Sequence, residues 1–306
     1  MEEMKNRVYG VVGIKSIMAN WNADFTGNPK TTSDGKIFGS DKAFKFPIKK
    51  MWEAEGKKVL YVKSYKNEKD NIQAKNLSER FNKLFDVDLK SIKKKEEVFQ
   101  KLFSAIDVLN FGATFAEGNN NISITGAVQV GQGYNKYDNT NVEIIDILSP
   151  FRNSKQDDAN NSTIGSKIVS DEAHYMYPFS VNPQNYNIYK EVLGQFASYT
   201  KEAYESFKKG CLVAATAYNT NSKMGCENEF AIFVECKEGS KLYLANLDQY
   251  IRFEKNRDGK DIIDITELSK ILKTHKDEIE SVEVYYNKYA IEMKGMEDSY
   301  IEKYLF

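Results

Sequence analysis

Cysteine and histidine are scarce in this 306-residue chain. It has three cysteines (Cys211, Cys226 and Cys236), an odd number without a C-x-x-C pair, and two histidines, His174 and His275. This pattern offers no disulfide framework and favours a reducing, cytoplasmic location with buried thiols. The two histidines lie far apart in the chain, which argues against a zinc site built on several histidines. We expect no cofactor.

Long apolar segments are also missing. The longest apolar runs have the length of a strand, so the sequence predicts no membrane-spanning helix and no membrane partner. The first ten residues, MEEMKNRVYG, lack the apolar region of a secretory signal. Hydrophobic residues still make up 41 % of the chain, which is enough for a substantial core. We expect one domain that covers residues 1–306.

The periodicity predicts an α+β fold with a mostly antiparallel sheet, because strand-like and helix-like segments alternate irregularly. Helices are expected at 47–55 (with Pro47 at its first position), 77–85, 98–106 and 187–209 (ended by Gly210), and after Asp264. Strands are expected at 7–21, 58–65, 122–130, 173–181, 211–218, 229–236, 241–247 and 281–286.

Charge is nearly balanced overall but unevenly placed. The formal net charge is −1. Residues 30–66 hold ten Lys and four acids, a net +6, whereas residues 226–306 hold 18 acids and 12 bases, a net −6. Such a chain can present a basic groove, and it can also stack head to tail with copies of itself.

The basic segment includes a Gly-rich loop, residues 22–46, followed by a short basic helix. Backbone amides, a helix start and several lysines converge there, which is the chemistry that holds the phosphates of a strand. No G-x-x-x-x-G-K-[ST] motif occurs, so a nucleotide P-loop is excluded. A solvated helix face and a mobile surface loop are the plainer alternatives. The candidate phosphate-binding residues are Lys30, Lys36, Lys42, Lys45, Lys49 and Lys50.

A second polar insertion covers residues 149–171. It is rich in Gly, Asn and Ser and has isolated apolar residues, among them Phe151, Ile164 and Ile168. Disorder is one interpretation. The other is a projecting ribbon whose apolar side chains wedge between bases and which reaches a neighbouring subunit.

Three motifs in order resemble one family. The first is Asn22–Lys30 (NADFTGNPK), leading to the basic run Ile48–Trp52; the second is Asp107–Gly112 followed by Thr125–Val130 (TGAVQV). The third is the 149–171 insertion followed by YMYPFSVN, residues 175–182. Together they resemble the Cas-seven family of the RAMP superfamily, the backbone subunit of the CRISPR surveillance complex called Cascade, and most of all its type I, I-B-like members.

The resemblance implies a ferredoxin-like (RRM-related) core with a thumb-like β-ribbon at 149–171. It implies a non-enzymatic subunit that binds CRISPR guide RNA, assembles with other copies of itself along that RNA, and joins other Cascade subunits. Target DNA would be read through the guide. Phe111, Gly112, Gly131 and Gln132 are expected where a sheet face meets RNA, although the glycines can also form a plain turn. The chain lacks the RNP1 pattern, so the usual RRM binding mode is not supported.

The chain departs from the family at Lys45–Pro47, where many relatives have Ser or Gln before the basic helix. Two other functions remain open. One is a metal-dependent endoribonuclease that cleaves target RNA with a loop aspartate, Asp34 or Asp41. The other is a protein scaffold without nucleic acid.

Overall fold

A nine-stranded sheet forms the centre of the molecule in the computed structural model, which describes residues 2–68, 71–148, 163–218 and 220–305. Its strands run in the order β16-β14-β11-β1-β10-β8-β2, with β7 and β9 also paired to β10. All pairs are antiparallel except β14 with β16. The strands are β1 (Val8–Ala19), β2 (Phe38–Gly39), β7 (Val128–Val130), β8 (Gly133–Asn135), β9 (Val142–Leu148), β10 (Thr163–Val181), β11 (Cys226–Cys236), β14 (Ile279–Tyr286) and β16 (Ile301–Tyr304). The predicted α+β class is confirmed.

Strand β1 lies in the middle of this sheet and is buried on both faces, as its sequence predicts. Val8, Val12 and Ile14 pack into one hydrophobic core, and Tyr9 and Val11 pack into a second core on the other side. Because successive side chains of a strand point to opposite faces of the sheet, β1 contributes side chains to both cores.

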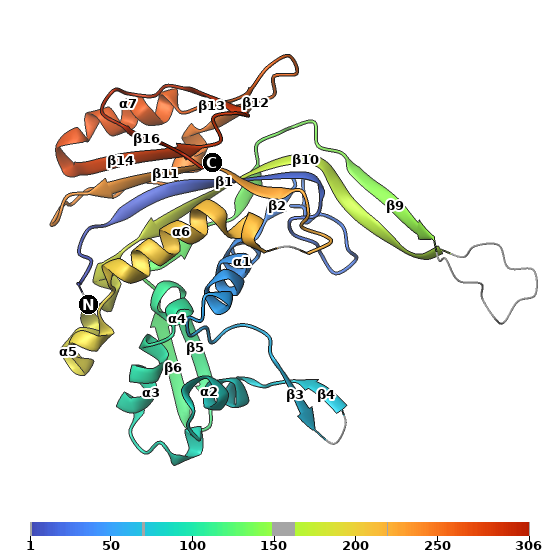
Figure 1. The fold of residues 1–306 in the computed structure, drawn as a ribbon. Coiled ribbons are helices and arrows are strands. Elements are labelled where there is room, and N and C mark those ends of the chain that lie inside the picture. The colour runs from blue at the N-terminus through green and yellow to red at the C-terminus, as the bar shows by residue number, and fades with distance from the viewer. Residues whose placement is uncertain (1, 69–70, 149–162, 219, 306) are drawn as a thin grey trace, which may run out of the picture.

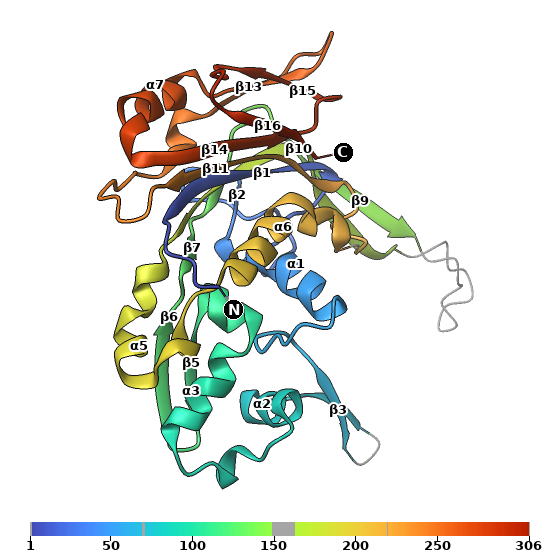
Figure 2. The same cartoon turned by 60° about the vertical axis from the view of Figure 1, so that its left-hand side comes forward.

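The first core lies under helices α1 (Asp41–Ala54) and α6 (Lys201–Ala217), which pack against each other on one face of the sheet (Figures 1 and 2). A helical lobe extends below them. It contains α2 (Leu77–Phe85), α3 (Lys95–Phe103), α4 (Ile106–Phe111) and α5 (Asn187–Leu193), with the hairpins β3 (Tyr65–Glu68)–β4 (Asn71–Ala74) and β5 (Gly112–Glu117)–β6 (Asn120–Thr125). Helix α2 corresponds to the helix predicted at 77–85, and α3 corresponds to the one predicted at 98–106.

The second core lies under the C-terminal unit on the opposite face (Figure 2). This unit consists of α7 (Thr266–Thr274) and a three-stranded sheet, β12 (Arg252–Glu254), β13 (Asp261–Asp264) and β15 (Ile291–Lys294). Asp264 accepts a hydrogen bond from the backbone N–H of Thr266 at 2.8 Å, but the cap residue of α7 is Ile265, so the helix begins one residue later than predicted.

A two-stranded ribbon projects from the main sheet (Figure 1). We call it the arm; it consists of β9 and residues 163–171 of β10. Its first strand begins at Val142, before the start of the predicted insertion at 149. Residues 149–162 lie outside the described part of the chain. The described strands on either side of these residues form a ribbon that begins before the predicted insertion, and the insertion at 149–171 itself stays a prediction.

Several predicted elements were wrong. Residues 211–217 belong to α6, which continues through Gly210, a glycine against which Ile48 of α1 packs directly. The predicted helix 187–209 is instead two helices, separated by Gly194–Thr200. Residues 58–64 and 241–246, which were predicted within strands, have no regular secondary structure, although Val59 and Leu60 are buried. Periodicity alone does not distinguish such buried apolar runs from strands.

The described helices offer none that is both long and apolar enough to cross a membrane. All three cysteines are free and buried.

Gly39 fixes the approach to α1, and its replacement provides a test of this packing. A Cβ at Gly39 would overlap the Tyr177 hydroxyl and crowd the Trp21 ring. We expect Gly39→Ala to lower the free energy of unfolding by about 3 kcal/mol through overpacking. The matched control is Gly165→Ala in the arm, where a Cβ meets nothing within 4 Å; its effect should stay within about 0.5 kcal/mol. Equal stabilities in chemical denaturation would contradict the packing described.

Candidate nucleic-acid interface

Helix α1 starts six residues earlier than predicted. The Ser40 hydroxyl accepts a hydrogen bond from the backbone N–H of Ala43 at 3.3 Å, and Asp41 follows as an acidic residue in the first turn. A serine cap and an early acid stabilise a helix start. Pro47 lies inside the helix on its buried face, so the prediction that it opens the helix was wrong. The first turns of α1 therefore carry Lys42 and Lys45, which the sequence had placed in a loop.

Two of the predicted lysines on α1 have acidic partners on the same helix. Lys45 lies 2.9 Å from Asp41, and Lys50 lies 2.5 Å from Glu53. Burial alone would raise the pKa of Asp41, but hydrogen bonds from Lys45 and Gln132 and the Lys45 charge lower it. Asp41 thus stays ionised and joins the helix start to Gln132, one of the predicted site residues.

Lys49 is largely enclosed and lies beside a buried carboxylate. Its side chain is 17 % exposed, and its Nζ lies 4.0 Å from the fully buried Asp107 carboxylate. That carboxylate also accepts hydrogen bonds from the backbone N–H groups of Leu60 and Tyr61, each at 2.8 Å. Burial lowers the pKa of Lys49 and raises that of Asp107. The pair connects α1, α4 and the segment before β3.

Lys42 is different, because it is exposed and forms no ion pair within the described part of the chain. One turn further along the same helix, Phe46 is 37 % exposed and meets Tyr218 edge to face at 5.3 Å. A free ammonium beside an accessible ring suits a strand with both phosphates and bases. This stretch of α1 is thus the most open part of the basic helix.

The loop before α1 is more ordered than expected. Bridges between Ala23 and Pro29 and between Thr31 and Ile37 fold residues 22–38 into two short turns. Lys30 lies 5.7 Å from the Phe38 ring, and Lys36 is exposed beside the second turn. Residues 41–46 of the predicted loop belong to α1, and local Asp and Thr side chains close the two turns in the remainder.

Phe25, at the first turn, is fully exposed, with a relative accessibility of 111 %. It lies within the NADFTGNPK motif but is not among the predicted site residues. An apolar ring in the middle of a polar, Gly-containing loop was the available signal. An aromatic side chain as exposed as this one is suited to stacking on a base.

The other predicted residues lie at the junction of α4 and β5 or in the turn between β7 and β8. Phe111 is half-buried, stacks on Trp52 at 5.6 Å, and has Lys45 at 5.3 Å and Lys49 at 5.8 Å from its ring centre. Gly112 follows it at the start of β5. Gly131 and Gln132 join β7 to β8. The structure therefore brings Lys45, Lys49, Phe111 and Gln132 together around α1, with Lys30 and Lys36 on the adjoining loop.

In the arm, Ile168 is half-buried, and its carbonyl accepts a hydrogen bond from Asn20 at 3.1 Å. The same Asn20 amide donates to the Gly27 carbonyl at 2.9 Å, so the arm and the loop 22–28 share one anchor. Ile168 lies near the base of the arm. Phe151 and the side chain of Ile164 lie outside the described residues.

The first strand of the arm, β9, was not predicted and is apolar. All seven residues of β9 are exposed, and five of them are large and apolar: Val142, Ile144, Ile145, Ile147 and Leu148. A run of β-branched residues between a polar turn and the insertion was the signal. An exposed apolar strand of this kind marks a surface that a partner covers.

The three aspartates near the loop form local contacts. Asp24 accepts hydrogen bonds from Thr26 and Asn28, Asp34 accepts one from the Thr32 hydroxyl, and Asp41 pairs with Lys45. Hydrogen bonds to their charged forms lower the pKa values of Asp24 and Asp34. These contacts account for the aspartates as turn and cap residues.

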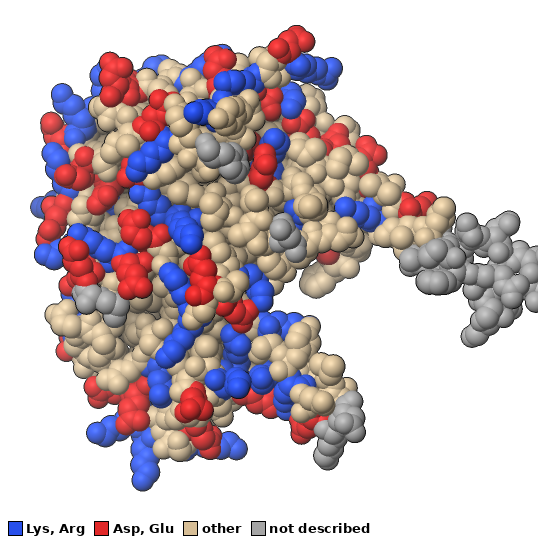
Figure 3. Space-filling view, viewed as in Figure 1, with Lys and Arg blue, Asp and Glu red and all other residues tan. Residues whose placement is uncertain are grey.

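Figure 3 shows a hollow between the arm and the helical lobe, with Lys and Arg side chains gathered along its wall beside α1 and on the lobe. Phe25 and Lys36 belong to the loop 22–38, which lies next to the base of the arm (Figure 1). Basic side chains thus line the hollow, and the loop that carries Phe25 lies beside the arm that borders it.

Comparisons with known proteins agree on one class. A family model described as CRISPR-associated protein Cas7 matches residues 6–274. A solved chain from a "CRISPR RNA-guided surveillance complex, pre-nicking" has the same fold, with a TM-score of 0.58, 13 % identity, and coverage of 97 % of this chain and 95 % of that chain. A second, from a "CRISPR RNA-guided surveillance complex", gives a TM-score of 0.49 and 16 % identity, with 95 % of each chain covered. No curated protein matches the chain.

The buried carboxylate beneath α1 gives a prediction for the stability of this site. Asn in place of Asp107 keeps the shape but has a single accepting oxygen, so one of the two backbone N–H groups loses its partner and Lys49 loses its counter-charge. We expect Asp107→Asn to lower the free energy of unfolding by about 1–3 kcal/mol. Asp86→Asn, at the exposed left-handed end of α2, is the control and should change it by less than about 0.5 kcal/mol. Urea titrations that place both variants on the wild-type curve would refute this role.

Proposed function

The chain belongs to the family of CRISPR-associated protein Cas7, and from that premise we propose that it is a backbone subunit that binds guide RNA. Several copies would line one RNA strand, together with the other subunits of a Cascade complex. The protein would hold the RNA backbone and its shape, and base pairing by the guide would select the target DNA. The finer placement in a type I, I-B-like complex in the cytoplasm is part of this proposal.

One observation carries the RNA-binding role: lysine side chains and exposed aromatic rings lie close together on the same basic segment. Lys42 and Phe46 lie one turn apart on α1, and Phe25 projects from the loop before it. Phosphate neutralisation by lysines and base stacking on open rings are the two interactions by which proteins bind single strands without reading their sequence. Lys30, Lys36, Lys45, Lys49 and Lys50 would add to the positive field of this surface.

The arm supports the multi-copy part of the proposal. Five large apolar side chains of β9 are exposed on a ribbon that stands away from the body of the protein (Figure 1). Within one chain nothing in the described residues covers them. A second copy, with its own hollow beside α1, is the partner that a repeated assembly on RNA would supply.

The topology supports a ferredoxin-like core. In chain order the central elements run strand, helix, two strands, helix, strand: β1, α1, the β7–β8 segment, β10, α6 and β11. Their sheet order is β11-β1-β10-β8, and both helices cover one face. Numbered along the chain this is 4-1-3-2, the arrangement of a βαββαβ unit. The helical lobe, the arm and the C-terminal unit are then insertions and additions to that unit.

The proposal treats the subunit as non-catalytic. Asp24, Asp34 and Asp41 are held in local hydrogen bonds or an ion pair, which supports a structural role for them. Cleavage of RNA is the alternative, and a direct test distinguishes the two. Metal-dependent loss of added single-stranded RNA that disappears in Asp34→Ala or Asp41→Ala would favour the endoribonuclease and contradict the proposal.

Lys42 provides the test of phosphate binding. Lys42→Ala should weaken guide-RNA binding and flatten the log–log dependence of affinity on salt by about 0.7, because one phosphate contact is lost. Lys270→Ala is the control, since Lys270 is an exposed lysine of α7 on the opposite face of the sheet. Binding isotherms at several salt concentrations measure both. Identical salt slopes for the two variants would contradict a phosphate contact at Lys42.

Ile144 provides the test of the arm. Ile144→Asp should leave the free energy of unfolding of the isolated chain within about 0.5 kcal/mol of the wild type, because the side chain is exposed. It should reduce the number of copies that assemble on one guide RNA, as measured by light scattering after gel filtration. Ile188→Asp on α5 is a matched control, since both isoleucines are 66 % exposed. Normal assembly by the Ile144 variant would show that the arm is not part of the interface between copies.

A further inference from the structure

A buried polar cluster lies where the arm strand β10 meets the C-terminal unit, away from the basic surface. His174 on β10 is fully buried, and its ring stacks on Phe253 of β12 at 3.7 Å. Around it lie Glu172 on β10, Glu229 on β11 and Asp261 on β13. The cluster therefore brings together three strands of two sheets.

The two ring nitrogens of His174 face carboxylates on opposite sides. Nδ1 lies 2.9 Å from Glu229, whose side chain is 2 % exposed, and Nε2 lies 3.2 Å from Oε1 of Glu172. A buried carboxylate on one nitrogen of an imidazole fixes its tautomer, so that the other nitrogen presents a lone pair; this is the usual support of a metal-binding histidine. Two acceptors cannot face each other at 3.2 Å unless a proton or a cation lies between them.

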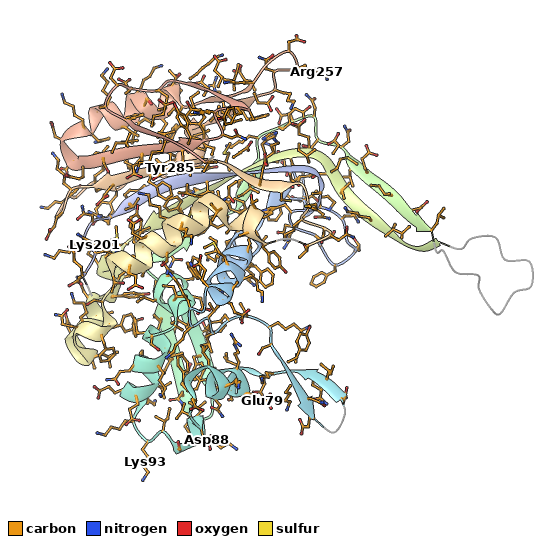
Figure 4. The ribbon with its side chains drawn as sticks, viewed as in Figure 1. Glu79, Asp88, Lys93, Lys201, Arg257 and Tyr285 are labelled. Carbon is orange, nitrogen blue, oxygen red and sulfur yellow. The ribbon has the colours of Figure 1, made fainter. Side chains whose placement is uncertain are left out.

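Lys255 already marks a cation position in this cluster. Its Nζ lies 2.7 Å from Oε1 of Glu172 and 3.1 Å from Oδ2 of Asp261. The other oxygen of Asp261 accepts a hydrogen bond from the backbone N–H of Asn256, which orients the carboxylate. The Lys255 side chain is 32 % exposed. It belongs to the loop between β12 and β13, which Figure 4 shows at the outer rim with Arg257, so the ammonium can move into water without a change in the sheets.

The geometry points to a divalent transition-metal site formed by Glu172, His174 and Asp261, in which the metal ion and the Lys255 ammonium are alternative occupants. The three ligand atoms lie within 4.8 Å of one another. The 3.2 Å between Nε2 and Oε1 is close to the edge of a tetrahedron with metal–ligand bonds of about 2.0–2.1 Å. Asp261 has to move inward when the ammonium leaves. One imidazole with two carboxylates suits Zn²⁺, whereas Mg²⁺ prefers oxygen ligands in a larger octahedral shell.

The exchange also conserves charge. With three carboxylates, the Lys255 ammonium and the proton between Nε2 and Glu172, the cluster carries a formal charge of −1. A divalent cation that replaces the ammonium and that proton restores the same −1. A buried cluster tolerates such a replacement because no uncompensated charge is left behind. The bound ion would fasten the base of the arm to the C-terminal sheet.

Zinc binding by the full-length chain tests this site. The chain should carry no affinity tag and should be treated with nuclease and chelator before calorimetric titration with ZnCl₂. We expect one Zn²⁺ per chain and no uptake of Mg²⁺. Asp261→Asn removes a ligand, and Glu229→Gln removes the support of the imidazole; each should weaken binding at least about tenfold. Lys255→Met removes the competing ammonium and should tighten binding.

Two controls distinguish a specific site from adventitious zinc binding. His275→Gln, which alters the other histidine, should leave zinc affinity unchanged. Cobalt in place of zinc should give a visible ligand-field absorption that Asp261→Asn abolishes, and the circular dichroism of each variant reports whether it is folded. The inference is overturned if neither the wild type nor Lys255→Met binds zinc. It is equally overturned if folded Asp261→Asn and His275→Gln change the affinity alike.

Discussion

The double-sided burial of β1 is the constraint on which the rest of the structure depends. Its residues pack into two cores, and it is paired along its length to β10 and β11. Because the strand cannot slip by one residue without exchanging its two faces, the register fixes where the chain leaves it. Asn20, directly after the strand, then holds both the loop 22–28 and the base of the arm. The position of the proposed RNA surface follows from that anchor.

The basic helix shows how the protein keeps a concentration of positive charge without losing stability. Lys45, Lys49 and Lys50 each have an acidic partner, and the carboxylate beneath Lys49 is satisfied by two backbone amides. Such pairing offsets the cost of removing charges from water. Lys42 and the open rings of Phe25 and Phe46 remain available to a ligand. Within this segment, the paired lysines thus stabilise the fold, whereas neighbouring residues are available to contact RNA.

The sequence predicted those features that depend on local pattern. The alternation in β1, the amphipathic helices of the lobe and the cluster of lysines before Trp52 were all visible in it. The start of α1 was misplaced because Pro47 is typical of the first helical position and the cap at Ser40 was not recognised. Residues 211–218 were assigned to a strand because a buried helix segment is equally apolar. The exposure of β9 and the meeting of His174 with Asp261 depend on tertiary contacts between distant segments, which no local pattern encodes.

The central claim is that guide RNA lies along the loop and helix that follow β1. Ultraviolet cross-linking of RNA to the chain in complex with its natural partner subunits, followed by identification of the linked peptides, tests this most directly. The account predicts that the linked peptides fall within residues 22–54 and include Phe25 or Phe46. Cross-links confined to α7 and the strands of the C-terminal unit, or a complex that contains no RNA, would contradict it.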